Sequence, residues 1–521
     1  MKLTMELVAN MSFISFPFFL LATTTVLLYY TLPKRCQWIV LLLASIAFYA
    51  TYGLVQFIPM LLAAITAYLA AKWMQAIYDA EEGGTTAERK AKCKGNLLFA
   101  VAVLVILLLY AKLGNRVLQG LAGLFSLNGD LMQAAVALGV SYYTFSLISY
   151  VADVYWRKDR AETNFLRLLL FVLYFPKVLQ GPISRHKNLA PQLAQSHKFD
   201  YREFCFGFQL MLWGYFKKMV IADRLAIFVN TVFGKAESAF GSHLLVAACF
   251  AAPHLYCDFS GCMDIAGGFS QMLGLELEAN FNHPFFSRSA AEYWRRWHIT
   301  LGTWFKDYIY MPLMISPKLI NISKKLRQRF GHRAGKTFMT IVPLMAVWLL
   351  TGLWHGTKWN YVVWGLYWGV IIICSTVFAP ELKKLTRVLH INTEAGSWKI
   401  FQMVRMFLLV AVSRIITVPG DLETSWNIFR NMALQFHPEG LVNGSLYTFG
   451  LDRPNFILSI VCLFVLWSAS MLQERGCVRE RLAGSNIVFR WSAYYLLFFA
   501  IIIFGIYGPG YDAASFVYMK F

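Results

Sequence analysis

Long apolar segments recur along the chain, and they constrain its fold more than any other sequence feature. A helix needs about 20 apolar residues to cross the hydrocarbon of a bilayer. The segments are solidly apolar rather than alternating, which excludes a transmembrane β-barrel. The sequence therefore predicts an all-α polytopic membrane protein with about 11–13 transmembrane or re-entrant helices. The apolar segments are 13–31, 38–52, 56–71, 97–111, 132–151, 165–175, 204–221, 244–256, 338–354, 361–378, 401–418, 456–471 and 491–507.

Composition supports a membrane protein. Of 521 residues, 58% are hydrophobic and 15% are charged, whereas soluble domains carry roughly 25% charged residues. We interpret the first apolar segment as a retained anchor, because further spans follow it. The net charge of +20 indicates positive cytoplasmic loops and contact with anionic lipid, and we expect no nucleic-acid partner. The nine cysteines have no disulfide or zinc spacing, so we expect no metal site.

We expect a single membrane domain with four parts. Residues 1–130 are predicted to form helical hairpins, 381–507 to form ordinary spans, and 508–521 to form an extracytoplasmic aromatic tail. The middle part, 131–380, is rich in Trp, Tyr, Arg, His and Pro although it remains broadly apolar. Polar residues at membrane depth are costly and usually mark function, so we expect the catalytic core there.

The densest polar stretch ends at His298. If it is one helix, Glu292 lies one turn from Arg295 and Arg296, so ion pairs can form. Three- and four-residue spacing also places Trp294, Trp297, His298 and Leu301 on a shared side of that helix. An interfacial amphipathic helix with Trp and Arg at the headgroup level would give the same pattern.

A second histidine, His355, ends a strongly apolar segment. Gly352 and Gly356 bracket it and permit close approach of backbone or ligand. An imidazole at membrane depth suits general acid–base catalysis, because its pKa lies near neutrality. The alternative is a histidine that packs between helices and bonds to a neighbouring carbonyl.

Two further stretches combine polar residues with helix breakers. Asp258 and Asp264 precede Gly267 and Gly268, so we expect a broken or re-entrant element there. These carboxylates could orient a histidine, bind a cation or pair with arginines. The other stretch is 174–185, where two prolines and a glycine predict a loop at the membrane surface.

These motifs, in this order, resemble the membrane-bound O-acyltransferase (MBOAT) family. The resemblance is closer to its bacterial branch, which contains alginate O-acetyltransferase membrane subunits and teichoic-acid D-alanyl transferases. One departure is the long basic stretch between Met311 and Thr337. The motifs that carry the resemblance are Ser15–Phe19, Ser141–Asp153, Gln180–Ile183, Asp258–Gly261, Asn280–Asn282, Tyr293–His298 and Trp354–Gly356.

The resemblance implies a ring of helices around a central tunnel that joins the two membrane faces. His355 would be the principal catalytic base, and His298 the second active-site histidine. Arg295 and Arg296 would attract the phosphates of the donor. Other residues expected near the donor, or supporting the site, are Asp258, Trp297 and Asn282.

The resemblance also implies the reaction. We expect an inner-membrane enzyme that passes an acyl group, most simply acetyl, to an extracellular polysaccharide or cell-wall polymer. The donor would be acetyl-CoA or an acyl carrier protein thioester, with no tightly bound cofactor, and a separate extracytoplasmic esterase-like transferase would complete delivery. Tyr518 in the tail would accept the acyl group, unless it is an interfacial anchor.

Three alternative functions remain. D-Alanyl transfer to teichoic acid from a carrier protein belongs to the same class of reaction. A transporter or flippase would also place polar groups at the bilayer midplane, although the sequence has no matching pair of broken half-repeats. A structural membrane scaffold is the third alternative.

Overall fold

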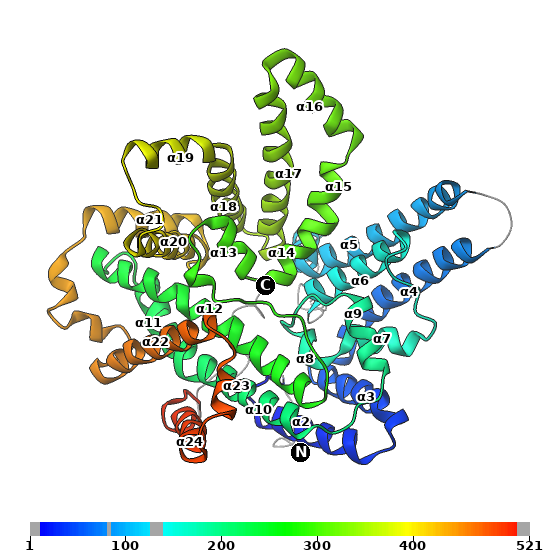
Figure 1. Ribbon diagram of the computed structural model, residues 1–521, viewed down its shortest axis with the longest axis horizontal. Coiled ribbons are helices and arrows are strands. Elements are labelled where there is room, and N and C mark those ends of the chain that lie inside the picture. Colours follow the sequence, from blue (N-terminus) through cyan, green and yellow to red (C-terminus); the bar gives the residue numbers. More distant parts are fainter. Residues whose placement is uncertain (1–10, 81–84, 126–138, 508–521) are drawn as a thin grey trace. The chain divides into compact units, whose positions relative to one another are not determined.

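The computed structural model describes residues 11–80, 85–125 and 139–507 (Figure 1). Within these ranges the chain forms helices and turns, with one isolated β-bridge between Phe281 and Trp297. The predicted all-α class is therefore confirmed. The reason is that an α-helix satisfies its own backbone hydrogen bonds, which lipid cannot do.

The helices fall into two compact units. The first runs to Tyr215 and includes Cys262–Glu278; the second comprises Phe216–Gly261 and Ala279–Ile506. The long helix α12 (Gly241–Met272) contributes to both. The other helices of the first unit are α2 (Phe16–Thr31), α3 (Gln37–Ala50), α4 (Phe57–Asp79), α5 (Thr86–Phe125), α6 (Val140–Tyr155), α7 (Phe165–Leu173), α8 (Phe175–Val178), α9 (His186–Ala194) and α10 (Tyr201–Tyr215).

The second unit begins with a π-helix, η4 (Phe216–Ala222). It contains a second π-helix, η6 (Lys306–Tyr310). Its α-helices are α11 (Asp223–Gly234), α13 (Ala290–Arg296), α14 (Ile299–Phe305), α15 (Met311–Met314), α16 (Pro317–Phe330), α17 (His332–His355), α18 (Trp359–Val377), α19 (Ala379–Val388), α20 (Gly396–Thr417), α21 (Leu422–Leu434), α22 (Arg453–Glu474), α23 (Val478–Ala483) and α24 (Ile487–Phe504).

Eight helices in the described ranges are long and apolar enough to cross a membrane. These eight helices are α4, α5, α12, α17, α18, α20, α22 and α24. The described parts of the remaining predicted segments form other helices, such as α2 and α7. None of the apolar window of α24 is buried inside the protein, whereas 83% of that of α12 is. The exposed apolar side chains of α24 therefore face lipid, and α12 is an interior helix.

The predicted break after Asp258 is wrong, because α12 is continuous from Gly241 to Met272. Its glycines serve close packing instead. A Cβ added at Gly268 would lie 2.4 Å from the carbonyl oxygen of Gly207 on α10. The two glycines thus let α10 and α12 approach each other more closely than larger residues would allow.

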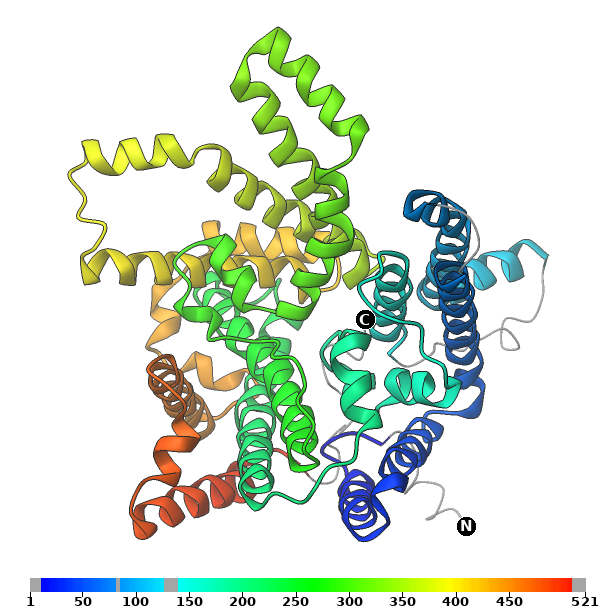
Figure 2. The ribbon, with the colours of Figure 1, turned by 45° about the vertical axis from the view of Figure 1, so that its right-hand side comes forward.

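Helices α17 and α18 form a hairpin that carries His355 at its turn. Figures 1 and 2 both show the two helices side by side, with α16 and α19 at their outer ends. A Cβ added at Gly352 would lie 2.5 Å from the carbonyl oxygen of Tyr361, and one at Gly365 would lie 2.5 Å from that of Trp348. Facing glycines therefore bring the two backbones into contact just before the histidine.

We predict that Gly352→Ala destabilises the protein by about 1–3 kcal/mol, because the added methyl overfills the hairpin. The change should be measured as a lower midpoint of thermal unfolding of the purified protein in detergent. The matched control is Gly95→Ala in α5, where an added Cβ meets nothing within 4 Å. That variant should be neutral or more stable, because alanine favours helix. Equal midpoints for the two variants would contradict this account of the hairpin.

Candidate active site

His298 lies in a sharp turn between two short helices. α13 ends at Arg296 and α14 begins at Ile299, and the backbone of His298 has left-handed angles, φ 46° and ψ 52°. The prediction of one continuous helix through this stretch is therefore wrong. Residues other than glycine occupy this region only where their surroundings hold them. Here the side chain of His298 is 2% exposed.

Asn280 holds the imidazole of His298. One side-chain atom of Asn280 accepts hydrogen bonds from the backbone N–H and the hydroxyl of Thr300, at 3.1 and 2.9 Å. Because a backbone N–H can only donate, that atom is the amide oxygen. The same oxygen lies 3.1 Å from Nδ1 of His298. Nδ1 therefore carries the proton, and Nε2 carries the lone pair.

The His298 ring is also uncharged. Burial lowers its pKa to about 3, because an apolar environment disfavours the charged form. Phe259 supplies part of that environment, with its ring edge-on at 4.9 Å between centroids. The ring thus presents a lone pair on Nε2, which can accept a hydrogen bond.

His355 is buried at the end of α17, where the chain turns into α18. Its ring packs edge-on against Trp354 and Trp364, each at 4.9 Å between centroids. The next residue is Gly356, and a Cβ there would lie 2.3 Å from the Tyr361 ring. The aromatic neighbours and the glycine together fix where the imidazole lies.

Trp354 connects the two histidines. Its indole lies 5.9 Å from the ring of His298 and 4.9 Å from that of His355, between centroids. His298 and His355 lie 57 positions apart in the sequence. Their common contact makes them parts of one site within the second unit.

A pocket of about 720 Å³ adjoins this site. Most of its lining is apolar, while Arg295 and Lys306 contribute positive charge. His298 lines the pocket; His355 does not, although Thr351, one turn earlier on α17, does. An apolar pocket with cationic groups suits an elongated molecule that has an anionic end.

The other predicted residues divide into two groups. Arg295 and Trp297 line the pocket. Arg296 instead pairs with Glu292 at 3.0 Å and also with Glu474. Asn282 is exposed, and its backbone N–H donates to the carbonyl of Arg296 at 2.9 Å. The structure therefore does not bring Arg296 or Asn282 into the pocket lining, and Tyr518 lies outside the described residues.

Asp258 belongs to a buried ion-pair group. Nζ of Lys218 on η4 lies 2.7 Å from Asp258 and 2.8 Å from Asp223. The neighbouring Lys217 donates to the hydroxyl of Ser260 at 2.9 Å. Of the roles considered for Asp258, pairing with a basic residue is the one seen here, although the partner is lysine rather than arginine. It ties η4 to α12.

Sequence reasoning missed Asn280 and Lys218. The Asn-Phe-Asn motif at 280–282 contains two asparagines, and the sequence analysis predicts a site role for Asn282 rather than Asn280. Spacing alone does not tell which asparagine faces inward. Lys217 and Lys218 lie together within the apolar segment 204–221. Because charged groups at membrane depth need partners, this position could have indicated a buried ion pair.

Known proteins resemble this chain over most of its length. The model of the MBOAT, membrane-bound O-acyltransferase, family matches residues 41–412. The protein named "Probable alginate O-acetylase AlgI" from Azotobacter vinelandii is 32% identical over 410 residues, which is 78% of this chain and 74% of that protein.

Two other relatives have different printed activities. A peptidoglycan O-acetyltransferase of Helicobacter pylori is 27% identical, over 66% of this chain and 65% of its own length. A teichoic acid D-alanyltransferase of Bacillus subtilis is 26% identical, over 47% of this chain and 60% of its own length. All three names describe transfer of an acyl group.

We predict that Asn280→Asp raises the pKa of His298 by about 1–3, because a carboxylate beside Nδ1 favours the imidazolium. Titration of the imidazole nitrogens by ¹⁵N NMR measures this change. The control is Thr300→Val, which removes a hydroxyl donor to Asn280 but leaves the amide beside the ring. An unchanged His298 titration in a folded Asn280→Asp protein would refute the assigned contact.

Proposed function

Because the chain belongs to the membrane-bound O-acyltransferase family, we propose that it passes an acetyl group from a cytoplasmic thioester to the outer face of the cell membrane. The acetyl group would serve O-acylation of an extracellular polysaccharide or cell-wall polymer. The chain is an acyltransferase with many membrane-spanning helices. Acetyl rather than D-alanyl is favoured because the relative at 32% identity is named an O-acetylase, whereas the D-alanyltransferase is 26% identical.

One observation carries the proposal: two buried histidines share the ring of Trp354 beside an apolar pocket. In the proposed reaction His355 removes the proton of the acceptor hydroxyl. The hydroxyl oxygen then bonds to the thioester carbonyl carbon, the C–S bond breaks, and the thiolate takes up a proton as it leaves. His298, held by Asn280, positions the reacting groups through Nε2.

The pocket supports a thioester donor. Its apolar lining fits the acyl group and the linking arm, and Arg295 and Lys306 fit the phosphates of coenzyme A or of a carrier protein. A dry pocket also strengthens hydrogen bonds to the oxyanion that forms on the thioester carbon. We propose an inner-membrane location and a separate extracytoplasmic transferase as the partner that completes delivery.

The test removes each histidine in the full chain. His355→Ala should lower acyl transfer at least 100-fold, since general acid–base groups contribute about 10²–10⁴-fold. His298→Ala should lower it by about 100-fold, because a misplaced reacting group can cost that much. Polymer acetylation in cells and thioester consumption by purified protein are the measurements, and protein abundance should not change. The control is His332→Ala at the exposed start of α17, which should leave acyl transfer unchanged.

The same variants separate the alternative functions. A transporter would retain most of its activity after His355→Ala and lose it with an ion-pathway carboxylate. A scaffold would show no effect of either histidine. Normal acyl transfer by His355→Ala protein would therefore eliminate the proposed enzyme mechanism. Finding D-alanine ester in place of acetyl ester on the polymer would show that the protein transfers D-alanyl groups.

Tyr518 provides a separate prediction. If its hydroxyl carries the acyl group outward, Tyr518→Phe should abolish extracellular acylation, because phenylalanine keeps an interfacial anchor but lacks the nucleophile. Ester content of the secreted polymer measures this outcome. Tyr507→Phe is the matched control for loss of a nearby tyrosine hydroxyl. Normal acylation in the Tyr518→Phe strain would leave only the anchoring role.

A further inference from the structure

A groove of about 540 Å³ opens on the first unit between α4 and α5. Both helices are long and apolar enough to cross a membrane, and only 39% of the apolar window of α4 and 28% of that of α5 is buried. Side chains at the groove are therefore available to the bilayer. The lining residues are Ile65, Thr66, Leu69, Ala70, Trp73, Asn96 and Phe99.

Large side chains form the sides of the groove, and a small one forms its floor. Ala70 is 6% exposed, and its carbonyl oxygen accepts a hydrogen bond from Nδ2 of Asn96 at 2.9 Å. This bond places the alanine where α4 meets α5. Between larger neighbours a small residue leaves room, so the groove is an apolar channel with an amide beside it. The exposed apolar side chains along the channel are Ile65, Leu69, Trp73 and Phe99.

Hydrogen bonds between the two helices fix how they align. Asn96 bonds to Ala70, and two turns earlier on α5 Nη1 of Arg89 donates to the carbonyl oxygen of Tyr78 at 2.9 Å. The helices therefore run antiparallel toward the connection between them. Trp73 and Asn96 thus lie at the end of the groove that is nearest this connection.

That end of the groove also marks the edge of the hydrocarbon. The apolar segments of the two helices are 56–71 and 97–111, so Trp73 and Asn96 lie just beyond them. Tryptophan is enriched at this interfacial level. The other lining residues lie within the apolar segments. A molecule in the groove therefore meets apolar surroundings along most of its length and polar ones at one end.

A basic side chain continues from the polar end of the groove. Lys92 is exposed and lies one helical turn before Asn96, so it shares a face of α5 with Asn96 and Phe99. Cβ atoms four positions apart on a helix lie about 5–6 Å from each other, and a lysine can extend further toward the headgroups. The nearby Lys90 is directed elsewhere, with Nζ 5.5 Å from the centre of the Tyr155 ring. Lys92 is thus placed to meet an anionic group at the end of the groove.

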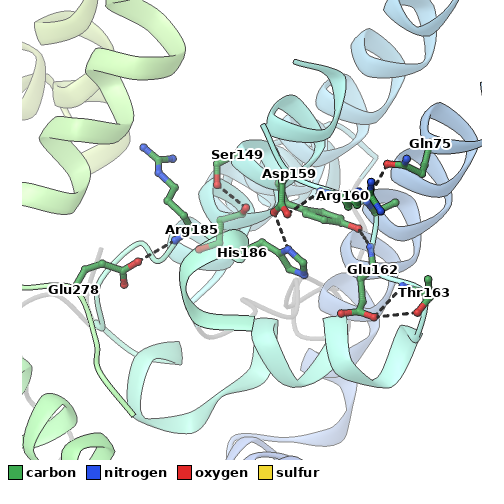
Figure 3. Close-up of polar contacts among 12 residues, drawn as sticks. Gln75, Ser149, Asp159, Arg160, Glu162, Thr163, Arg185, His186 and Glu278 are labelled. Atoms are coloured by element: carbon green, nitrogen blue, oxygen red, sulfur yellow. Dashed lines mark hydrogen bonds and ion pairs between the residues drawn. The ribbon is translucent and has the colours of Figure 1, made fainter. Parts of the chain in front are cut away.

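The other side of α4 is already covered by the loop between α6 and α7 (Figure 3). Oε1 of Gln75 accepts from the backbone N–H of Ala161 at 3.3 Å, and the hydroxyl of Tyr68 donates to the carbonyl oxygen of Thr163 at 2.7 Å. Helical spacing places Gln75 on the far side of α4 from Trp73. The loop therefore leaves the groove open to the bilayer.

We propose that this groove binds an anionic phospholipid. One acyl chain lies along Leu69 and Ile65 in the channel over Ala70, and the phosphate meets the ammonium group of Lys92. Trp73 packs at the level of the ester groups. A zwitterionic lipid fits the same channel but gains less from the lysine, because its headgroup has no net charge. The site includes no residue of the candidate active site and is independent of the proposed acyl transfer.

Photo-cross-linking of the full-length protein in detergent micelles tests the proposal. The probe is a phosphatidylglycerol with a diazirine on one acyl chain, and peptide mass spectrometry locates the labelled residues. Labelling should concentrate on groove residues such as Leu69 and Phe99, whereas peptides of α24, whose apolar window is entirely exposed, report ordinary contact with lipid. Unlabelled phosphatidylglycerol should compete for the groove about 5-fold better than phosphatidylcholine, because one lysine favours the anionic headgroup by about that factor.

Lys92→Gln separates the site from the general attraction of a basic protein for anionic lipid. The variant removes one charge at the groove, so phosphatidylglycerol should compete about 5-fold less well and no better than phosphatidylcholine. The matched control, Lys94→Gln, removes an exposed charge from the other side of α5 and should keep the wild-type preference. A folded Lys92→Gln protein that keeps this preference would overturn the proposal.

A second variant tests the channel itself. Thr66→Phe places a ring beside Ala70, so groove labelling should fall to the level of α24 although Lys92 is intact. An unchanged midpoint of thermal unfolding shows that the variant is folded. The proposal is also overturned if the wild-type groove is labelled no more than α24, if phosphatidylcholine competes as well as phosphatidylglycerol, or if folded Thr66→Phe keeps the full labelling.

Discussion

Lipid hydrocarbon offers a polar group no hydrogen-bond partner, so every polar group within the membrane must find one inside the protein. This requirement explains the helical backbone throughout the described ranges. It also explains why Lys218 stands between two carboxylates, Asp223 and Asp258, rather than beside one. Removing one member of such a buried ion-pair group destabilises the protein, because the remaining charge cannot reach water.

The same requirement shapes the proposed active site. Asn280 uses its amide oxygen for three donors at once: the hydroxyl and backbone N–H of Thr300 and the imidazole of His298. A charged imidazole would be unstable in this environment, and the ring is neutral for that reason. One neutral amide thus gives His298 a fixed tautomer, with Nε2 as a hydrogen-bond acceptor. The strained backbone at His298 is held by the same hydrogen bonds.

Close helix packing positions the second histidine. The facing glycines of α17 and α18 allow backbone contact just before His355, and the large rings of Trp354 and Trp364 then fill the space around it. Small and large residues thus have complementary uses: glycines bring the helices together, and tryptophans exclude water. A water-poor site suits acyl transfer, because water competes with the hydroxyl acceptor for the thioester.

The sequence by itself determined the helical class and most of the spans, and it singled out the two histidines as candidates. Apolar length is a local property, and it is read directly from segments such as 361–378 and 456–471. The ordered motifs likewise identified the family, which the match over residues 41–412 confirms. The basic stretch between Met311 and Thr337 forms α15, α16 and the first turns of α17.

Only the tertiary structure decided which polar residues meet. Asn280 and Asn282 are equivalent in a motif, yet Asn280 contacts His298 and Asn282 is exposed. Lys218 and Asp258 are 40 residues apart, and their pairing depends on η4 packing against α12. Hydrogen bonds between distant segments depend on packing, which sequence spacing does not encode.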